Sequence, residues 1–303
     1  MAFQLSPGVN VSEVDLTTVV PATGASEGAI AGCFEWGPTN KIVTVSNEIE
    51  LVDRFGKPAT NSYVSFFSAA NFLAYGNNLK VVRAANTSTA LNACGASGIL
   101  IQNDDDYQIN YRDMQAASNK GQFAAKYPGS LGNGLIIGML ADGSSFGTWD
   151  YAQYFDGAPG TSTYVSDRGG LNDEMHIIVI DGNGSFSGKQ DTVLEKFAYV
   201  SKAIDAKNED GSSNYYVDVI AQRSKYIYVI NHPANSHFGI ASTGNSFDYG
   251  DTSDYVDTLA GGADGVPTDS NYETAYDNFV NKDAVDVSLI VTGGVSQTVA
   301  EYV

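Results

Sequence analysis

Basic side chains are scarce in this chain of 303 residues. It carries 16 Lys and Arg against 35 Asp and Glu, which gives a formal net charge of −19. Such a charge repels the phosphates of nucleic acids and anionic lipids, so we expect neither a nucleic acid nor a membrane as partner. The imbalance is steepest after Ala234, where eleven acidic residues stand against one cation, Lys282. This composition is typical of a highly soluble protein, or of one whose acidic face meets a basic partner.

Cysteine and histidine are almost absent. Two cysteines, Cys33 and Cys94, cannot build a disulfide framework or a zinc site, and their small, apolar neighbours predict buried free thiols. The three histidines, His176, His232 and His237, stand in no metal-ligand motif. The sequence therefore predicts no metal site and no cofactor.

Long apolar runs are missing as well. No stretch reaches the ~18 apolar residues that span a bilayer, and the start of the chain has no basic segment before an apolar one. We therefore expect a soluble protein without a signal peptide, which matures in a cytoplasm. Its hydrophobic content of 43%, with 32 Gly and 18 Tyr, predicts a folded, turn-rich chain of one large or two ordinary domains.

An α/β pattern follows the first 27 residues. Residues 28–38 form a small, apolar run that Gly-Pro ends, as in a buried strand. Residues 46–58 predict a short helix, with Ser46 or Asn47 as its N-cap and Gly56 just past its C-terminus. Residues 61–76 predict a second helix, and residues 79–85 a strand. Strand, helix, helix and strand in this order are typical of an α/β layer.

The middle of the chain differs in composition. Gly, Ser, Asn, Asp and Tyr become frequent between about residues 87 and 258. Four runs there are predicted as strands: 133–140, 175–181, 215–221 and 225–231. Residues 191–205 fit either a short helix or an extended segment, so that choice stays open. Together these elements predict a separate α+β domain.

The first pattern returns after residue 259. Residues 268–281 predict a helix with an acidic start, residues 284–292 a buried strand of a parallel sheet, and residues 295–303 the beginning of another helix. We therefore predict an α/β core domain, incomplete here, that is interrupted by an inserted α+β, β-rich domain and preceded by an extended arm. The predicted boundaries are 1–22 for the arm, 23–88 and 259–303 for the two parts of the core domain, and 89–258 for the inserted domain.

No group of residues predicts catalysis. Asp104, Asp105 and Asp106 could bind calcium or act in glycoside hydrolysis, but a solvated turn is the favoured interpretation. Residues 181–188 resemble a calcium loop without its required Gly and Glu, so a hairpin turn is expected. Residues 129–134 do not have the spacing of a dinucleotide fingerprint. The chain is therefore predicted not to be an enzyme.

The opening segment has the period of a strand. Phe3, Leu5, Val9 and Val11 all fall on odd positions, with Pro7 and Gly8 between them. Pro7 and Gly8 are poor residues for a central strand and are tolerated at an edge. No tight turn follows, so the segment does not predict a hairpin.

Several stretches occur together in a specific order. They are SPGV (6–9), EWGP (35–38), KYPGSLGNGL (126–135), VLEKF (193–197), YYVDVI (215–220), LAGGADG (259–265) and DAVDVSLIV (283–291). In this order they resemble the tail sheath proteins of contractile-tail bacteriophages, in their T-even-like form. Complete members of that family continue well past the point that matches Val303, so a C-terminally truncated sheath protein is expected.

The resemblance implies a structural role. Sheath subunits stack as hexameric rings in a helical assembly around the tail tube, and contraction drives the tube through the host envelope for genome delivery. The implied partners are neighbouring sheath subunits, the tail tube protein, and baseplate and tail terminator proteins. The implied location is the virion, after assembly in the host cytoplasm.

The resemblance also implies roles for particular residues. The N-terminal arm would join a sheet of a neighbouring subunit by β-augmentation, through Phe3, Leu5, Pro7, Gly8, Val9 and Val11. The alternative is a strand that folds back on its own domain. The implied structural motif residues are Trp36, Gly37, Pro38, Pro128, Gly129, Gly132, Asn133, Gly261, Gly262, Asp264 and Gly265.

Other functions stay open at this point. The sheath of a related contractile injection system, such as a bacteriocin or a secretion system, fits the same motifs. An acidic, β-rich module that binds glycans or a receptor would suit the many tyrosines. A hydrolase using Asp104, Asp105 and Asp106 is the third alternative.

Overall fold

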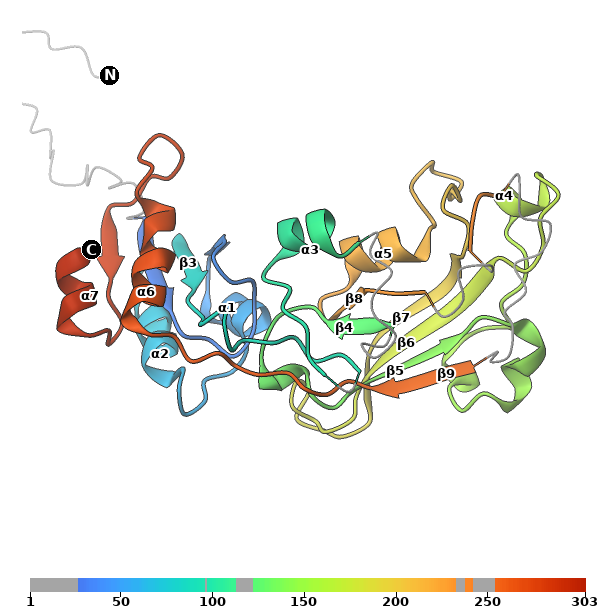
Figure 1. Ribbon diagram of the computed structural model, residues 1–303, viewed down its shortest axis with the longest axis horizontal. Coiled ribbons are helices and arrows are strands. Elements are labelled where there is room, and N and C mark those ends of the chain that lie inside the picture. Colours follow the sequence, from blue (N-terminus) through green and yellow to red (C-terminus); the bar gives the residue numbers. More distant parts are fainter. Residues whose placement is uncertain (1–26, 96, 113–121, 233–237, 242–253) are drawn as a thin grey trace, which may run out of the picture.

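The computed structural model describes residues 27–95, 97–112, 122–232, 238–241 and 254–303. The expected N-terminal arm, with Phe3, Leu5, Pro7, Gly8, Val9 and Val11, lies outside the described residues. The described part is an elongated mixed α/β structure with two lobes along its long axis (Figure 1).

Each lobe is built around its own sheet. The elements of the first lobe are β1 (Gly28–Gly32), β2 (Ile42–Val45), α1 (Glu48–Phe55), α2 (Tyr63–Leu73), β3 (Leu79–Arg83), α6 (Asp269–Tyr276), η6 (Asp277–Phe279), β10 (Leu289–Val291) and α7 (Gln297–Tyr302). Those of the second lobe are α3 (Asp104–Asn110), β4 (Phe123–Ala125), η2 (Ser130–Gly132), β5 (Leu135–Leu140), η3 (Gly143–Thr148), η4 (Ala152–Tyr154), α4 (Thr163–Ser166), β6 (Glu174–Asp181), β7 (Thr192–Ser201), α5 (Tyr216–Arg223), β8 (Ile227–Val229) and β9 (Asp254–Thr258).

The first sheet has the strand order β10-β1-β3-β2. Strand β1 pairs in parallel with β3 and β10, and β2 pairs antiparallel with β3. Helices α1 and α2 pack on one face, and α6 and α7 on the other. Coverage on both faces explains why β1 is entirely small and apolar. The strands predicted near residues 28 and 79 are confirmed. Strand β2 was not predicted. Strand β10 is shorter than the predicted 284–292, and it is an edge strand with Leu289 and Ile290 exposed, so the prediction of a buried strand is wrong.

Helix α1 has the ends that its sequence predicts. The Asn47 side chain accepts a hydrogen bond from the amide of Glu50 at 2.9 Å. Gly56 has a φ of 81°, and its amide donates to the carbonyl of Val52 at 2.9 Å. Helix α2 begins after Ser62, whose hydroxyl makes no capping bond and donates instead to Glu35 at 2.7 Å. This contact ties the start of α2 to the loop after β1.

The second sheet is antiparallel, with the order β7-β6-β5-β9. The strands predicted at 133–140 and 175–181 are confirmed as β5 and β6, and residues 192–201 take the extended alternative as β7. A separate antiparallel pair, β4 and β8, lies beside helices α3 and α5 (Figure 1). Residues 181–188 lie in the connection between β6 and β7, as expected for a hairpin.

Two local predictions are wrong. Residues 215–221 form most of α5 and not a strand, because the buried Tyr216, Val217, Val219 and Ile220 satisfy a helical spacing as well as an apolar run. Residues 104–106 form the first turn of α3 and not a solvated turn, because the Asn103 side chain caps that helix.

The expected thiols are present. Cys33 and Cys94 are both buried thiols, and burial raises the pKa of Cys33 to about 11. Among the described residues, no cluster of three or more His, Cys, Asp or Glu side chains could hold a metal ion. None of the described helices is long and apolar enough to cross a membrane.

Candidate functional site

The motif residues singled out from the sequence meet where the two lobes join. They come from three connections: the loop after β1, the segment between β4 and β5, and the segment after β9. The structure brings all of these residues to one junction: Trp36, Gly37, Pro38, Pro128, Gly129, Gly132, Asn133, Gly261, Gly262, Asp264 and Gly265. The glycine-rich stretches thus share a place in the fold although they are far apart in the chain.

Arg83, the last residue of β3, lies at the centre of this junction with 1% of its surface exposed. Its Nη1 donates to the carbonyls of Gly37 at 3.0 Å and Pro128 at 2.7 Å, and its Nη2 to that of Glu35 at 3.5 Å. Burial lowers the pKa of Arg83 to about 10, and the nearby Asp264 and Glu35 partly oppose this. One guanidinium group therefore holds loops of both lobes. The role of Arg83 was not predicted from the sequence, although a cation at the end of an apolar strand was a usable signal.

Close backbone contacts explain the glycines. A Cβ on Gly129, whose φ is 145°, would lie 2.9 Å from the carbonyl oxygen of Glu35. A Cβ on Gly262 would overlap the carbonyl oxygen of Gly129. The amide side chain of Asn133 makes a paired contact with Gly262, donating to its carbonyl at 3.0 Å and accepting from its amide at 2.8 Å. Glycine is required here because backbone packs directly on backbone.

Asp264 and Gly265 fix the returning segment. The Asp264 carboxylate accepts a hydrogen bond from the amide of Ser130 at 2.6 Å. Gly265 has a φ of 58°, and its carbonyl accepts from the amide of Asn86 at 2.8 Å. The first contact ties the segment to the loop after β4, and the second ties it to the loop after β3.

Trp36 carries apolar packing across the junction. It is 3% exposed and packs edge-on against Tyr127 and Phe186, with ring centroids 5.5 and 5.0 Å apart. Although Trp36 follows β1, it belongs to the core cluster of the second lobe. The indole therefore anchors the first lobe in the second.

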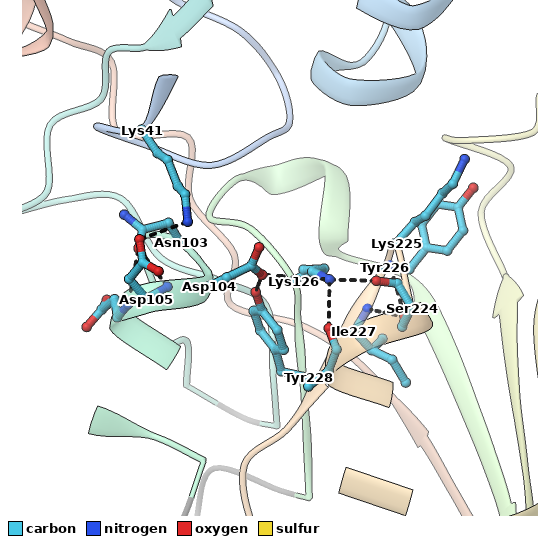
Figure 2. Close-up of polar contacts among 12 residues, drawn as sticks. Lys41, Asn103, Asp104, Asp105, Lys126, Ser224, Lys225, Tyr226, Ile227 and Tyr228 are labelled. Carbon is cyan, nitrogen blue, oxygen red and sulfur yellow. Dashed lines mark hydrogen bonds and ion pairs between the residues drawn. The ribbon is translucent and has the colours of Figure 1, made fainter. Parts of the chain in front are cut away.

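Lys126 forms a buried polar centre (Figure 2) and lines the same hollow as Trp36. Its ammonium group donates to the carbonyls of Ser224 at 2.7 Å and Ala221 at 3.3 Å, which satisfies the C-terminal end of α5. It also lies 3.8 Å from the carboxylate of Asp104, which accepts a hydrogen bond from the Tyr228 hydroxyl. Burial lowers the pKa of Lys126, and Asp104 opposes that effect.

Contacts at the surface also connect the two lobes. Lys41 pairs with Asp105 at 2.8 Å, and the Asn103 amide donates to the carbonyl of Thr39 at 3.1 Å (Figure 2). On the other side, Lys225 pairs with Asp53 of α1 at 2.8 Å. The residues of the acidic run 104–106 thus act in structural contacts, since Asp106 also accepts from the amide of Gln102 at 2.8 Å.

These features define the class of protein: a mixed α/β chain whose most distinctive residues hold two sheets together. Residues 29–84 match the family model of the tail sheath protein Gp18 domain III N-terminal region. The chain is 43% identical to the tail sheath protein of Enterobacteria phage T4 over 106 residues, which cover 35% of this chain and 15% of that protein.

Two further sheath proteins are similar over longer stretches. That of Vibrio phage KVP40 is 37% identical over 128 residues, 39% of this chain and 19% of its own length. That of Salmonella phage ViI is 28% identical over 215 residues, 66% of this chain and 32% of its own length. The expected resemblance is confirmed: parts of the chain are similar to bacteriophage tail sheath proteins. The chain spans between 15% and 32% of the length of these three relatives.

Solved structures with low similarity were also found. The sheath tail protein of Desulfitobacterium hafniense matches with a TM-score of 0.45 and 11% identity, over 98% of this chain and 47% of that one. The sheath tail protein of Listeria innocua matches with a TM-score of 0.45 and 13% identity, over 91% and 42%. The relationship stated above rests on the sequence comparisons.

Proposed function

We propose that this chain is a structural subunit of a contractile tail sheath. The observation that carries the proposal is the match of residues 29–84 to the sheath domain model, together with 43% identity to a phage tail sheath protein. In this role the subunits assemble in hexameric rings around a tail tube, between baseplate and terminator proteins, and contract to deliver the genome. The work is mechanical, and the energy would be stored in two packings of the same subunits.

The organisation of the subunit follows from the same proposal. Residues 23–88 and 259–303 form an α/β core domain, and residues 89–258 form a domain inserted into it. The parallel pairing of β1 with β10 supports this division, because residues 28–30 pair with residues 289–291. The inserted part leaves and returns through adjacent segments, since the amide of Leu91 donates to the carbonyl of Ala263 at 3.0 Å.

The N-terminal arm is proposed to link neighbouring subunits. An extended arm that adds to another subunit's sheet keeps subunits connected by several hydrogen bonds, each contributing about 0.5–1.5 kcal/mol. Sedimentation velocity of the chain with and without residues 1–16 tests this. Weaker self-association on deletion is expected, and equal association of both forms would contradict the arm's role.

Immunogold electron microscopy tests the proposed function itself. An antibody raised against this chain is applied to purified particles of the phage that encodes it. Gold along the whole length of the tail is expected. Gold confined to fibres or baseplate would favour a receptor-binding module instead, and gold on the capsid would contradict both roles.

A further inference from the structure

Three neighbouring hollows follow one another along the junction on the side of helix α1, and we call them together the groove. The largest hollow, of about 550 Å³, is lined by Trp36, Asp53 and residues 221–225 among others. A second hollow of about 140 Å³ shares Trp36 with the first. A third hollow of about 200 Å³ shares Val52 and Gly56 with the second. An elongated groove of this kind suits side chains of a polypeptide surface better than it suits a single small ion.

The groove is basic, whereas the whole chain is acidic. Its walls carry six basic residues against three acidic ones, whereas the whole chain has 16 basic and 35 acidic residues. The basic residues are Lys41, Arg54, Lys57, Lys126, Arg223 and Lys225, and the acidic ones are Glu35, Asp53 and Asp104. A hollow with an excess of one sign focuses its field and attracts the opposite sign.

Two of these cations have no ion-pair or hydrogen-bond partner among the described residues. Lys41, Lys126 and Lys225 have acidic partners, and Lys57 donates to the carbonyl of Phe186. By contrast, Arg54 and Arg223 are exposed, and within the described part of the chain neither side chain makes an ion pair or hydrogen bond. Arg54 lies in the last turn of α1 and Arg223 in the last turn of α5, so they belong to different lobes. Guanidinium groups bind carboxylates in a paired geometry, so both are available for an acidic partner.

The same chain carries a matching acidic surface on the other side of the first sheet. Helix α6 packs on the face opposite α1 and α2. Acidic residues recur every four positions along α6 and η6 and continue into the loop that follows, and we name them the acidic ridge: Asp269, Glu273, Asp277, Asp283 and Asp286. Four of the five are exposed and Glu273 is half-buried. Asp269, Glu273 and Asp277 are four apart and share one helical face. Asp269 and Asp277 accept hydrogen bonds from the neutral hydroxyls of Ser296 and Tyr302, so their negative charge remains.

We propose that the groove is a docking surface for a second copy of this chain, which inserts its acidic ridge. The occupant follows from charge complementarity between two surfaces of one molecule that lie on opposite faces of the same sheet. Such a contact is heterologous, because the groove of one copy binds the ridge of another copy. Repeated from copy to copy, it generates a ring or a helix. This inference rests on the proposed function, since it names a contact through which sheath subunits would assemble.

Charge reversal of each surface tests the proposal. The groove variant is Arg54→Glu with Arg223→Glu, and the ridge variant is Glu273→Arg with Asp283→Arg. Self-association of the whole chain is measured by sedimentation velocity up to about 200 µM at low salt. Each variant alone is expected to associate at least about tenfold more weakly than the wild type, because like charges then face each other. An equimolar mixture of the two variants is expected to restore association, because each reversed surface again meets its opposite.

Two lysines outside the groove provide the control. Lys189→Glu with Lys207→Glu reverses two exposed cations outside the groove and is expected to leave association unchanged. Circular dichroism identifies variants that fail to fold, and in that case Arg54→Gln with Arg223→Gln replaces the groove variant. A monomeric wild type, or variants that associate like it, would overturn the proposal. Binding of a hexaglutamate peptide by a monomeric wild type would assign the groove to another acidic partner. Tail labelling by immunogold with these negative results would leave the sheath role intact and remove only this contact.

Discussion

At the scale of single residues, a few buried polar groups hold the described structure together. Arg83, Lys126 and His176 are all buried and all hydrogen-bonded to backbone. Removing one of them costs more than its own bonds are worth, because its buried partners are left unpaired. Their effects on stability can be measured separately.

Replacing Arg83 by Met is expected to lower the free energy of unfolding by roughly 3 kcal/mol or more, because three carbonyl groups at the junction lose their donor. Urea unfolding followed by circular dichroism measures this. Arg168→Met is the matched control, since Arg168 is exposed and its guanidinium group contacts Tyr164, without bridging the two lobes. The control should cost less than about 1 kcal/mol, and an equal loss in both variants would contradict the role of Arg83.

Because His176 is buried, the free energy of unfolding is expected to fall in mild acid. Its Nδ1 accepts from the amide of Tyr199 at 3.1 Å, so its Nε2 carries the proton and donates to the carbonyl of Gly157 at 2.8 Å. Burial lowers the pKa of His176 below 6.5. The unfolded chain therefore binds a proton before the folded one does, and the free energy of unfolding falls as the pH drops below about 6.5.

Urea unfolding between pH 7.5 and 5.5 checks this, with His176→Gln as comparison. The variant should show a smaller slope, to which His232 still contributes, since burial lowers the pKa of His232 as well. Glu174 acts in the opposite direction nearer pH 4.5, because burial raises its pKa, and comparison with the variant cancels it. An identical slope in wild type and variant would exclude His176.

At the scale of elements, the sequence predicts what depends on neighbours in the chain. The cap at Asn47 and the turn at Gly56 are local, and both were predicted correctly. Helix α5 was mistaken for a strand because its apolar run fits both patterns, and the contact of Lys126 with its C-terminal end comes from a residue far away in the sequence. The start of α3 was missed because three adjacent carboxylates indicate solvent, whereas Asn103 turns them into the first turn of a helix.

Lys126→Met is expected to loosen α5. The carbonyls of Ala221 and Ser224 lose their donor, which should cost about 1–3 kcal/mol of unfolding free energy. Hydrogen exchange of the α5 amides should accelerate more than that of β6. Lys225→Met removes only an exposed pair with Asp53 and should cost less than about 1 kcal/mol. Unchanged exchange in α5 would show that Lys126 does not support the helix.

At the scale of the whole molecule, the junction could not be predicted from the sequence. The motif glycines were identified one stretch at a time, but nothing in their spacing shows that Gly129 and Gly262 touch, or that Arg83 lies between the loops. Contacts between segments more than a hundred residues apart depend on the packing of both sheets, which residue patterns do not encode locally. The motifs therefore indicated important positions without indicating their common site.

Gly262→Ala is expected to uncouple the two lobes. The added methyl group overlaps the carbonyl of Gly129 and pushes the segment after β9 away from the junction. Thermal unfolding should then broaden or split in two, because the lobes no longer unfold together. Gly147→Ala is the control, since a Cβ there would meet no atom within 4 Å. A single sharp transition at the wild-type temperature would contradict the proposed coupling.

We propose that this chain is a sheath subunit, and we expect the junction of its two lobes to stay closed while the sheath contracts. Cryo-electron microscopy of the phage tail in the extended and contracted states tests both parts at once. The account predicts that the described structure fits the sheath density in both states, with the contacts of Arg83 and Trp36 unchanged and the rearrangement confined to contacts between subunits. A sheath density that this fold does not fit, or a junction that opens on contraction, would contradict the account.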